Sequence, residues 1–156
     1  MILLEPVEIF IREAFKAGQS SASGSIEKGP RWKGIKEGTK SVTFLQGTLQ
    51  SFDPSSPLTT ATHFGRVGYS PSEGSFSNVA EKLDVAWCQW CLGHLSDVDL
   101  VSFLKRCKNA LRDERSLIVV KENLCRDTEN GEPRTVFDAQ DSSLTRYIQS
   151  LTLGIS

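Results

Sequence analysis

A glutamine, a tryptophan and a histidine follow an apolar run in residues 84–97, which read DVAWCQWCLGHLSD. Residues 83–88 predict a β-strand, and Gln89, Trp90 and His94 come directly after it. An imidazole can act as a general base or contact a substrate, and an indole ring can stack on a substrate or cover a cation. The alternatives are a hydrogen-bonded structural histidine and a tryptophan that fills the core.

The same segment contains a C-x-x-C spacing, formed by Cys88 and Cys91. Near a strand and a helix this spacing is one found in thioredoxin-like redox sites. Activation of such a thiol needs a helix N-terminus, and the helix signals here begin only at Ser96. A zinc site would need a second cysteine or histidine pair. The sequence therefore favours two packed free thiols, with a redox domain as an alternative, and predicts no metal site.

Three carboxylates also lie near predicted element boundaries. Glu5 follows the first strand, where an acid can accept hydrogen bonds from ribose hydroxyls or complement the dipole of the next helix. Asp138 and Asp141 flank a predicted turn into a helix that begins near Ser142. Asp141 is a good N-cap residue there, and the alternative is a pair of carboxylates that faces a cationic substrate.

The order of predicted elements is that of an α/β protein with a mostly parallel sheet flanked by helices. Strands are predicted at residues 2–4, 41–45, 83–88 and 117–120, and helices at residues 6–18, after Ser96 and after about residue 142. The predicted inward faces of the first two helices are Val7, Phe10, Ile11, Ala14 and Phe15, and Leu100, Val101, Leu104, Cys107 and Leu111. Ligands bind at the carboxyl ends of such strands. The residues predicted to gather at that edge are Glu5, Gln50, Gln89, Trp90, His94 and Asn123.

Two polar segments interrupt this order, at about residues 18–40 and 54–80. Glycine, serine, threonine and lysine dominate both segments, which indicates surface loops. We expect them to be insertions in one domain that spans residues 1–156.

Charge and hydropathy exclude several partner classes. The 156 residues carry a net charge of -1, without the basic excess typical of nucleic-acid binding. Apolar runs stay shorter than the ~18–20 residues that cross a bilayer, and the N-terminus lacks the basic region of a signal peptide. We expect a protein of the cytosol or nucleus that binds neither nucleic acid nor membrane.

Three longer motifs carry a resemblance to a known family. They read LDVAWCQWCLGHLSDVDLVSFLKRCKNALR, LIVVKEN and FDAQDSSLTR, and LLEPVEIFI and LQSF add two shorter ones. Together they strongly resemble the alpha-N-terminal protein methyltransferases. The resemblance implies a Rossmann-like class I domain that uses S-adenosylmethionine to methylate the α-amine of protein tails beginning X-Pro-Lys.

The resemblance also implies roles for residues, by position in the motifs. His94 and Asp141 match the candidate bases. The cofactor-binding positions are Glu5, Leu49, Gln50 and Gln89, and the substrate-binding positions are Trp90, Asn123, Asp138 and Ser143. A free α-amine has a pKa of ~7.7–8.0, so a nearby acceptor must remove its proton before methyl transfer.

Parts of the family pattern have no counterpart in this sequence. The first strand with its Gly-rich turn, the substrate-binding N-terminal helices and the last antiparallel strands are missing, and no GxGxxG occurs. We therefore expect a partial methyltransferase domain that binds cofactor weakly and is nearly inactive. The alternative is a non-catalytic remnant that binds or regulates a partner protein.

Overall fold

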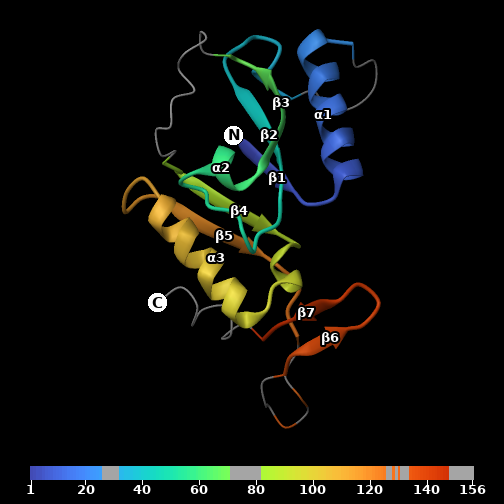
Figure 1. The fold of residues 1–156 in the computed structure, drawn as a ribbon, viewed down its shortest axis with the longest axis vertical. Coiled ribbons are helices and arrows are strands. Elements are labelled where there is room, and N and C mark those ends of the chain that lie inside the picture. Colours follow the sequence, from blue (N-terminus) through green and yellow to red (C-terminus); the bar gives the residue numbers. More distant parts are fainter. Residues whose placement is uncertain (26–31, 71–81, 126–127, 129, 131–133, 148–156) are drawn as a thin grey trace. The chain divides into compact units, whose positions relative to one another are not determined.

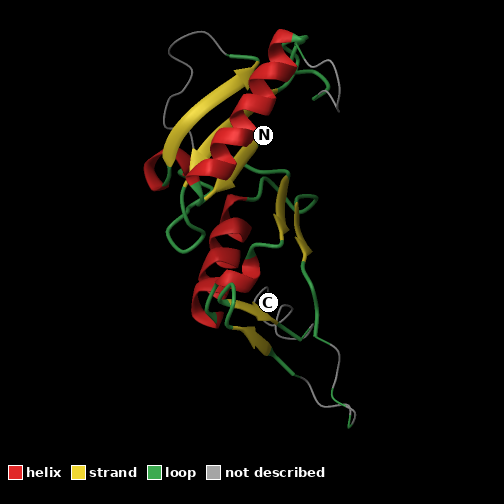
Figure 2. Ribbon diagram, turned by 90° about the vertical axis from the view of Figure 1, so that its right-hand side faces the viewer, coloured by secondary structure: helices red, strands yellow, loops and turns green. Residues whose placement is uncertain are grey.

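Contacts divide the chain into two compact units in the computed structural model (Figures 1 and 2). The structure describes residues 1–25, 32–70, 82–125, 128, 130 and 134–147. Unit 1 comprises Met1–Phe52 and Ser56–Val79, and unit 2 comprises Asp53–Ser55 and Ala80–Ser156. A single domain over residues 1–156 stays a prediction. Among the described residues, no helix has both the length and the apolar character that crossing a membrane requires.

Unit 1 is a three-stranded sheet packed against one long helix. Its elements are β1 (Ile2–Glu5), α1 (Glu8–Ser23), β2 (Ser41–Gln46), α2 (Pro57–Thr60) and β3 (Thr62–Gly68). β2 is central, parallel to β1 and antiparallel to β3. Phe44 of β2 is fully buried, and its ring lies 5.3 Å from that of Phe15 and 6.0 Å from that of Trp32, measured between centroids. This aromatic cluster holds α1 against the sheet.

The first helix is longer than the sequence predicts, and its predicted inward face is confirmed at Ile11, Ala14 and Phe15 but wrong at Val7 and Phe10. α1 passes Gly18 and ends at Ser23, where Gly24 adopts a left-handed conformation with φ 74°. A Cβ at Gly18 would lie 3.1 Å from Phe44, so this glycine permits close packing and does not end the helix. Ile11 is buried as predicted, but the predicted core residue Phe10 is 63% exposed.

The prediction of a surface loop over residues 54–80 is wrong at α2 and β3. Arg66 in β3 donates to Ser41 Oγ at 2.6 Å and to Thr43 Oγ1 at 3.2 Å, and so ties β3 to β2. The backbone N–H of Tyr69 then donates to Lys40 O at 2.8 Å. The segment at residues 18–40 also has local order, because helix α1 continues to residue 23 and turns follow residue 32. Residues 26–31 and 71–80 lie outside the described residues.

Unit 2 is built on a parallel strand pair with a helix alongside it (Figures 1 and 2). Its elements are β4 (Val85–Gln89), η1 (Leu92–His94), α3 (Asp97–Ala110), β5 (Leu117–Lys121), β6 (Val136–Asp138) and β7 (Ser143–Thr145). β4 and β5 are parallel, with Gln89 opposite Lys121. The buried side chains of α3 are Leu100, Phe103, Leu104, Cys107 and Ala110. The apolar pattern of the sequence did not predict that Phe103 and Ala110 are buried.

The predicted start of α3 is confirmed in atomic detail. Ser96 Oγ accepts a hydrogen bond from the Asp99 backbone N–H at 3.1 Å and donates to Asp99 Oδ2 at 2.7 Å. The first contact is the N-cap half of a capping box and satisfies one of the free N–H groups of the first helical turn. The Asp99 carboxylate binds the Ser96 hydroxyl and not the Ser96 backbone N–H that a complete capping box would use.

The predicted helix after residue 142 is wrong for the described residues, because β6 and β7 form an antiparallel hairpin there. Asp141 Oδ1 accepts from the Ser143 backbone N–H at 2.9 Å, and Ser142 has φ 58°. An aspartate that binds the N–H two residues ahead is common to turns and helix caps, which explains the error. The described residues thus form a mixed α/β structure with small sheets, two of which contain a parallel pair.

Candidate functional site

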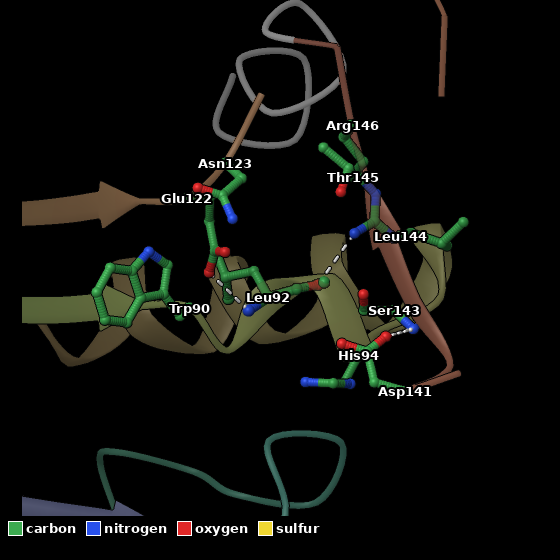
Figure 3. Close-up of a pocket in the computed structure, with 11 residues that line it drawn as sticks. Trp90, Leu92, His94, Glu122, Asn123, Asp141, Ser143, Leu144, Thr145 and Arg146 are labelled. Carbon is green, nitrogen blue, oxygen red and sulfur yellow. Dashed lines mark hydrogen bonds between the residues drawn. The ribbon is translucent and has the colours of Figure 1, made fainter. Parts of the chain in front are cut away.

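A cavity of about 130 Å³ lies within unit 2, beside the ends of β4 and β5 (Figure 3). The turn η1 and the β6–β7 hairpin complete its walls. The residues that line it are Trp90, Leu92, Gly93, His94, Glu122, Asn123, Asp141, Ser143, Leu144, Thr145 and Arg146. Five predicted site residues are among them: Trp90, His94, Asn123, Asp141 and Ser143. The volume is below the ~300–1,000 Å³ of typical small-molecule pockets. A cavity of this size suits a small group, such as the terminal residue of a peptide.

Trp90 lies where β4 ends and is held in an uncommon conformation. Its backbone N–H donates to Lys121 O at 3.1 Å, and its φ of 53° falls in the left-handed region. A bulky residue there is strained, and such strain is concentrated at functional sites. The ring is 61% exposed, with Lys121 Nζ 5.0 Å from its centroid. The indole therefore lies at the rim of the cavity, and the core-filling alternative is wrong.

His94 and Asp141 reach the cavity from different elements and lie next to each other in Figure 3. Hydrogen bonds from Ser143, from its side chain and then its backbone N–H, lower the pKa of the Asp141 carboxyl, and the charge of His94 acts in the same direction. Asp141 is therefore ionised at neutral pH. A carboxylate beside an imidazole can attract an ammonium group and accept a proton from it.

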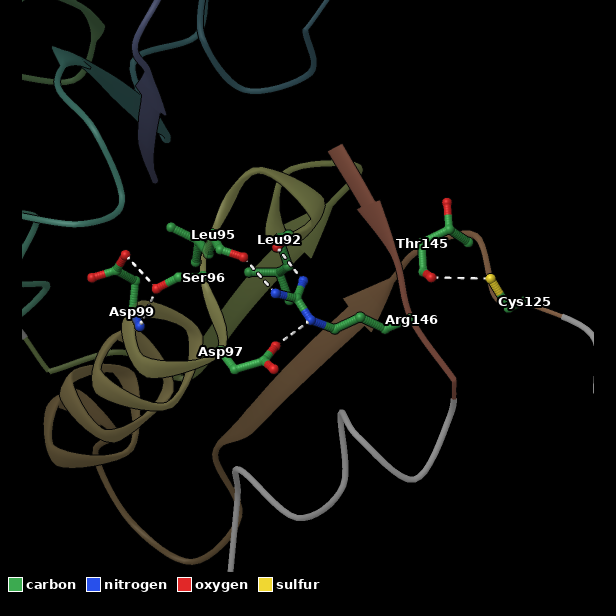
Figure 4. A network of polar contacts seen from close by, with 8 residues as sticks. All are labelled: Leu92, Leu95, Ser96, Asp97, Asp99, Cys125, Thr145 and Arg146. Carbon is green, nitrogen blue, oxygen red and sulfur yellow. Dashed lines mark hydrogen bonds and ion pairs between the residues drawn. The ribbon is translucent and has the colours of Figure 1, made fainter. Parts of the chain in front are cut away.

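Two charged residues that received no role from the sequence, Glu122 and Arg146, contact the turn that carries His94. Glu122 Oε1 accepts from the backbone N–H groups of Cys91 at 2.8 Å and Leu92 at 2.9 Å. Arg146 donates to Leu92 O at 3.0 Å, to Leu95 O, and to Asp97 Oδ1 at 2.9 Å (Figure 4). Its side chain is 3% exposed. The sequence offered one signal for Glu122, an acid directly after a strand.

Gly93 lets the hairpin approach the same turn. A Cβ at this position would lie 3.2 Å from Leu144 O and 3.5 Å from Ser143 Cβ. The first distance is shorter than most contacts of a Cβ atom and involves a backbone oxygen, whereas the second is an ordinary van der Waals contact. The absence of a side chain at residue 93 therefore sets how near β7 comes to η1.

A second group of predicted site residues lies within unit 1. Glu5 ends β1 and its Oε1 accepts from the Val7 backbone N–H at 2.9 Å, at the start of α1. Leu49 and Gln50 lie in the turn after β2, and Gly47 N–H donates to Glu5 O at 3.3 Å, which joins the two strand ends. Glu5 and the turn that contains Gln50 thus follow the ends of two parallel strands, whereas a common edge with Gln89, Trp90, His94 and Asn123 stays a prediction. The Val7 contact corresponds to the helix N-terminal role for Glu5.

Most of the sequence matches one known protein family. The family described as "AdoMet dependent proline di-methyltransferase" matches residues 37–153. The chain belongs to this family. Its members depend on S-adenosylmethionine (AdoMet), which is therefore the expected cofactor. The matched range contains every predicted site residue except Glu5.

Individual members of the proline di-methyltransferase family match shorter stretches of the chain. Over 71 residues the chain is 46% identical to "Alpha N-terminal protein methyltransferase 1" of Arabidopsis thaliana, which covers 46% of this chain and 23% of that protein. Over 85 residues it is 36% identical to mouse "N-terminal Xaa-Pro-Lys N-methyltransferase 1", covering 54% and 32%. The chain thus matches about a quarter to a third of the length of these relatives.

Two predicted residues of the family motifs lie in unit 2 outside the cavity. Gln89 Oε1 accepts from Trp87 Nε1 at 3.1 Å. Both side chains belong to one face of β4, because alternate residues of a strand share a face. Asp138 Oδ1 accepts from the Gln140 backbone N–H at 2.8 Å, in the turn after β6. Neither residue lines the cavity, so the structure does not join them to His94 and Asp141.

The cysteines of this family member are free thiols within the described residues. The hydrogen bond that the Cys88 thiol shares with Cys91 favours its protonated form and, together with burial, raises the pKa of Cys88, and burial raises the pKa of Cys107 to about 12. A thiol is nucleophilic only as thiolate, so neither group is activated. These properties support two packed thiols in the C-x-x-C segment and argue against the redox alternative.

Iodoacetamide should therefore label Cys88 and Cys107 at least about 100-fold more slowly in the native protein than in urea at pH 8. Labelling of Cys107 should accelerate as the pH rises toward 12, because its ordinary pKa of 9.0 is raised to about 12 in the fold. Mass spectrometry of labelled peptides gives each rate separately, with the half-buried Cys125 as an internal comparison. Rapid native labelling of Cys88 would restore the redox interpretation.

Proposed function

We propose that the chain takes part in AdoMet-dependent methylation of the α-amino group of protein N-termini that begin Xaa-Pro-Lys. The observation that carries the proposal is the cavity of unit 2, where a carboxylate, an imidazole, an amide and an exposed indole meet. The names of the matched relatives support the choice of substrate. We further propose that both units belong to one partial Rossmann-like class I domain, located in the cytosol or nucleus.

The substrate's first residues would enter the cavity with the α-amine directed at Asp141. Trp90 would cover the first residues with its exposed ring, and Asn123 would bind their backbone through its amide. Ser143 lies beside Asp141, and Asp138 on the same hairpin would attract the lysine at the third position.

Asp141 and His94 would have different roles in the removal of the proton from the substrate's α-amine. The lowered pKa of Asp141 makes its carboxylate a weak proton acceptor but a stable negative charge for an ammonium group. Histidine is the most frequent general base in proteins, and it takes up a proton more readily than a carboxylate whose pKa is lowered. His94 is therefore the better acceptor for the amine proton, and Asp141 holds the amine in place while it is lost.

Glu5, Leu49, Gln50 and Gln89 are the proposed cofactor-binding residues. A carboxylate at the end of a parallel strand suits ribose hydroxyls, and the neighbouring Leu49 offers an apolar surface for an adenine ring. These side-chain types fit the nucleoside part of AdoMet. When bound, AdoMet supplies a methyl group on a sulfonium, which a neutral amine can attack.

Peptide binding tests the substrate assignment. In ¹H–¹⁵N NMR titrations, a peptide beginning Ser-Pro-Lys should shift the amides of Trp90, Asn123 and Ser143. The same peptide with an acetylated N-terminus should bind at least about 10-fold more weakly, since it lacks the charge that Asp141 attracts. Equal binding of both peptides, or shifts confined to residues away from the cavity, would contradict the assignment.

A protein-binding module without catalysis is the second candidate. It is favoured by an exposed apolar face of the β4–β5 pair, which carries Val85, Trp87 and Leu117. Thermal melting with AdoMet or S-adenosylhomocysteine separates the two functions. A methyltransferase domain should melt at a higher temperature with either compound, and a melting temperature that neither compound changes would favour the binding module.

A further inference from the structure

We propose that Glu122 and Arg146 are positioning residues that hold His94 beside Asp141. The inference rests on the proposed function, because it concerns the same cavity. It assigns a role to two charged side chains that line the cavity but are not among the predicted bases or ligand-binding residues.

Glu122 fixes the beginning of the turn that carries His94. One carboxylate oxygen, Oε1, accepts from two successive backbone N–H groups, those of Cys91 at 2.8 Å and Leu92 at 2.9 Å. The first N–H groups of a helical turn have no partner inside the turn and need one from outside. Hydrogen bonds to a carboxylate are about twice as strong as those between neutral groups. The turn is therefore anchored two residues before His94.

Arg146 fixes the end of the same turn. Its guanidinium donates to Leu92 O at 3.0 Å and to Leu95 O, the carbonyl that follows His94. Nε donates to Asp97 Oδ1 at 2.9 Å, which adds an ion pair. The planar guanidinium serves all three acceptors at once, which an ammonium group cannot do with the same geometry.

The two residues act on opposite ends of one short helical turn, with charges that suit those ends. A carboxylate lies at the N–H end of η1 and a guanidinium at its carbonyl end, as the direction of the peptide dipoles favours. We refer to Glu122 and Arg146 as the turn clamp. It prevents η1 from moving along its axis, and so it also keeps the side chain of His94 in place.

The turn clamp also connects η1 to the hairpin. Arg146 directly follows β7, the strand that begins at Ser143, next to the turn that contains Asp141. The backbone N–H of Cys125 donates to Arg146 O at 3.2 Å, which holds this end of the hairpin near the end of β5. The spacing between His94 and Asp141 thus depends on Arg146, whose side chain is only 3% exposed where it lines the cavity.

Paired substitutions test each half of the turn clamp. Glu122→Ala removes the acceptor, whereas Glu122→Gln keeps an acceptor oxygen without the charge. Arg146→Met removes the donors, whereas Arg146→Lys keeps the charge and remains informative if Arg146→Met does not fold. Glu114→Ala and Arg115→Met are matched controls, because both residues are exposed in the turn after α3.

NMR of the histidine rings gives a readout that does not need activity. The chain has two histidines, and His63 in β3 serves as the internal reference. In Glu122→Ala and Arg146→Lys, the ring signals of His94 should shift or broaden, whereas those of His63 should not. Glu122→Gln should stay close to the wild type. His94 signals that are unchanged in Glu122→Ala and in both Arg146 variants would overturn the proposal.

Methyl transfer from AdoMet to a peptide beginning Ser-Pro-Lys gives the second readout. Glu122→Ala should lower kcat by about 10- to 100-fold, with the KM for AdoMet within about twofold, because misplacement of a reacting group affects the chemical step. Glu122→Gln should recover most of that loss. A rise in the KM for AdoMet with kcat unchanged would overturn a positioning role. If the wild type transfers no methyl group but His94 moves in the variants, the proposed function fails and the turn clamp stands.

Discussion

Replacing Asp141 with asparagine should lower the weak methyl transfer that we expect of this chain, to a peptide beginning Ser-Pro-Lys, by at least about 100-fold. The substitution removes the negative charge that the proposed function assigns to the α-amine. It keeps the turn, since an asparagine oxygen can accept the Ser143 N–H hydrogen bond that Asp141 accepts at 2.9 Å. The fold should therefore survive while the chemistry is lost. A single-turnover assay with radiolabelled AdoMet measures the rate even if turnover is slow.

Asp113→Asn is the matched control for this substitution. Asp113 also accepts a backbone N–H from the residue two positions ahead, Arg115, at 2.9 Å, but it does not line the cavity. Its replacement should leave the transfer rate within about twofold of the wild type, as is usual for an exposed site. Cofactor binding should be equal in both variants. Full activity of Asp141→Asn would show that its charge has no part in the reaction.

Replacing Phe44 with alanine should destabilise unit 1 by about 3–5 kcal/mol. Phe44 is fully buried in the central strand, between the rings of Phe15 and Trp32. Its removal would leave a cavity beneath α1 that Gly18, which lies against the ring, cannot fill. Urea denaturation followed through the methyl NMR signals of Val42 and Val67, which belong to the same core, measures the loss.

Phe10→Ala applies the same chemical change at an exposed position of α1. Its ring is 63% exposed, so the free energy of unfolding should change by less than about 0.5 kcal/mol. Equal costs for the two substitutions would mean that Phe44 does not form the core of this unit. The comparison is useful because the apolar pattern of the sequence assigned Phe10 to the core.

The parts of the fold that could be predicted are those whose signals lie close together in the sequence. The cap at Ser96, the apolar stripe of α3 and the β-prone runs of β4 and β5 all depend on neighbouring residues. β3 was missed because it contains two glycines and lies within a segment rich in serine, threonine and proline, which is typical of a loop. It is stabilised by distant partners, such as the Arg66 contacts with Ser41 and Thr43. Packing of this kind overrides local propensity.

Some residues of the candidate site could likewise be predicted from the sequence around them, and others could not. Trp90 and Asn123 could be predicted because residues after parallel strands share an edge of the sheet. Arg146 could not, since its role comes from the carbonyls of Leu92 and Leu95, about 50 residues earlier in the chain. The resemblance to a family supplied Asp141 and Ser143, whose turn chemistry alone indicated a helix cap.

Gly93 shows how a residue without a functional group can set the width of a cavity. A Cβ at residue 93 would lie 3.2 Å from Leu144 O, so a side chain there would push the hairpin slightly away from the turn that carries His94. A mutational survey limited to acids, bases and rings would overlook it. Gly93→Ala is therefore a substitution that would alter the width of this cavity while every acid, base and ring around it stays in the sequence.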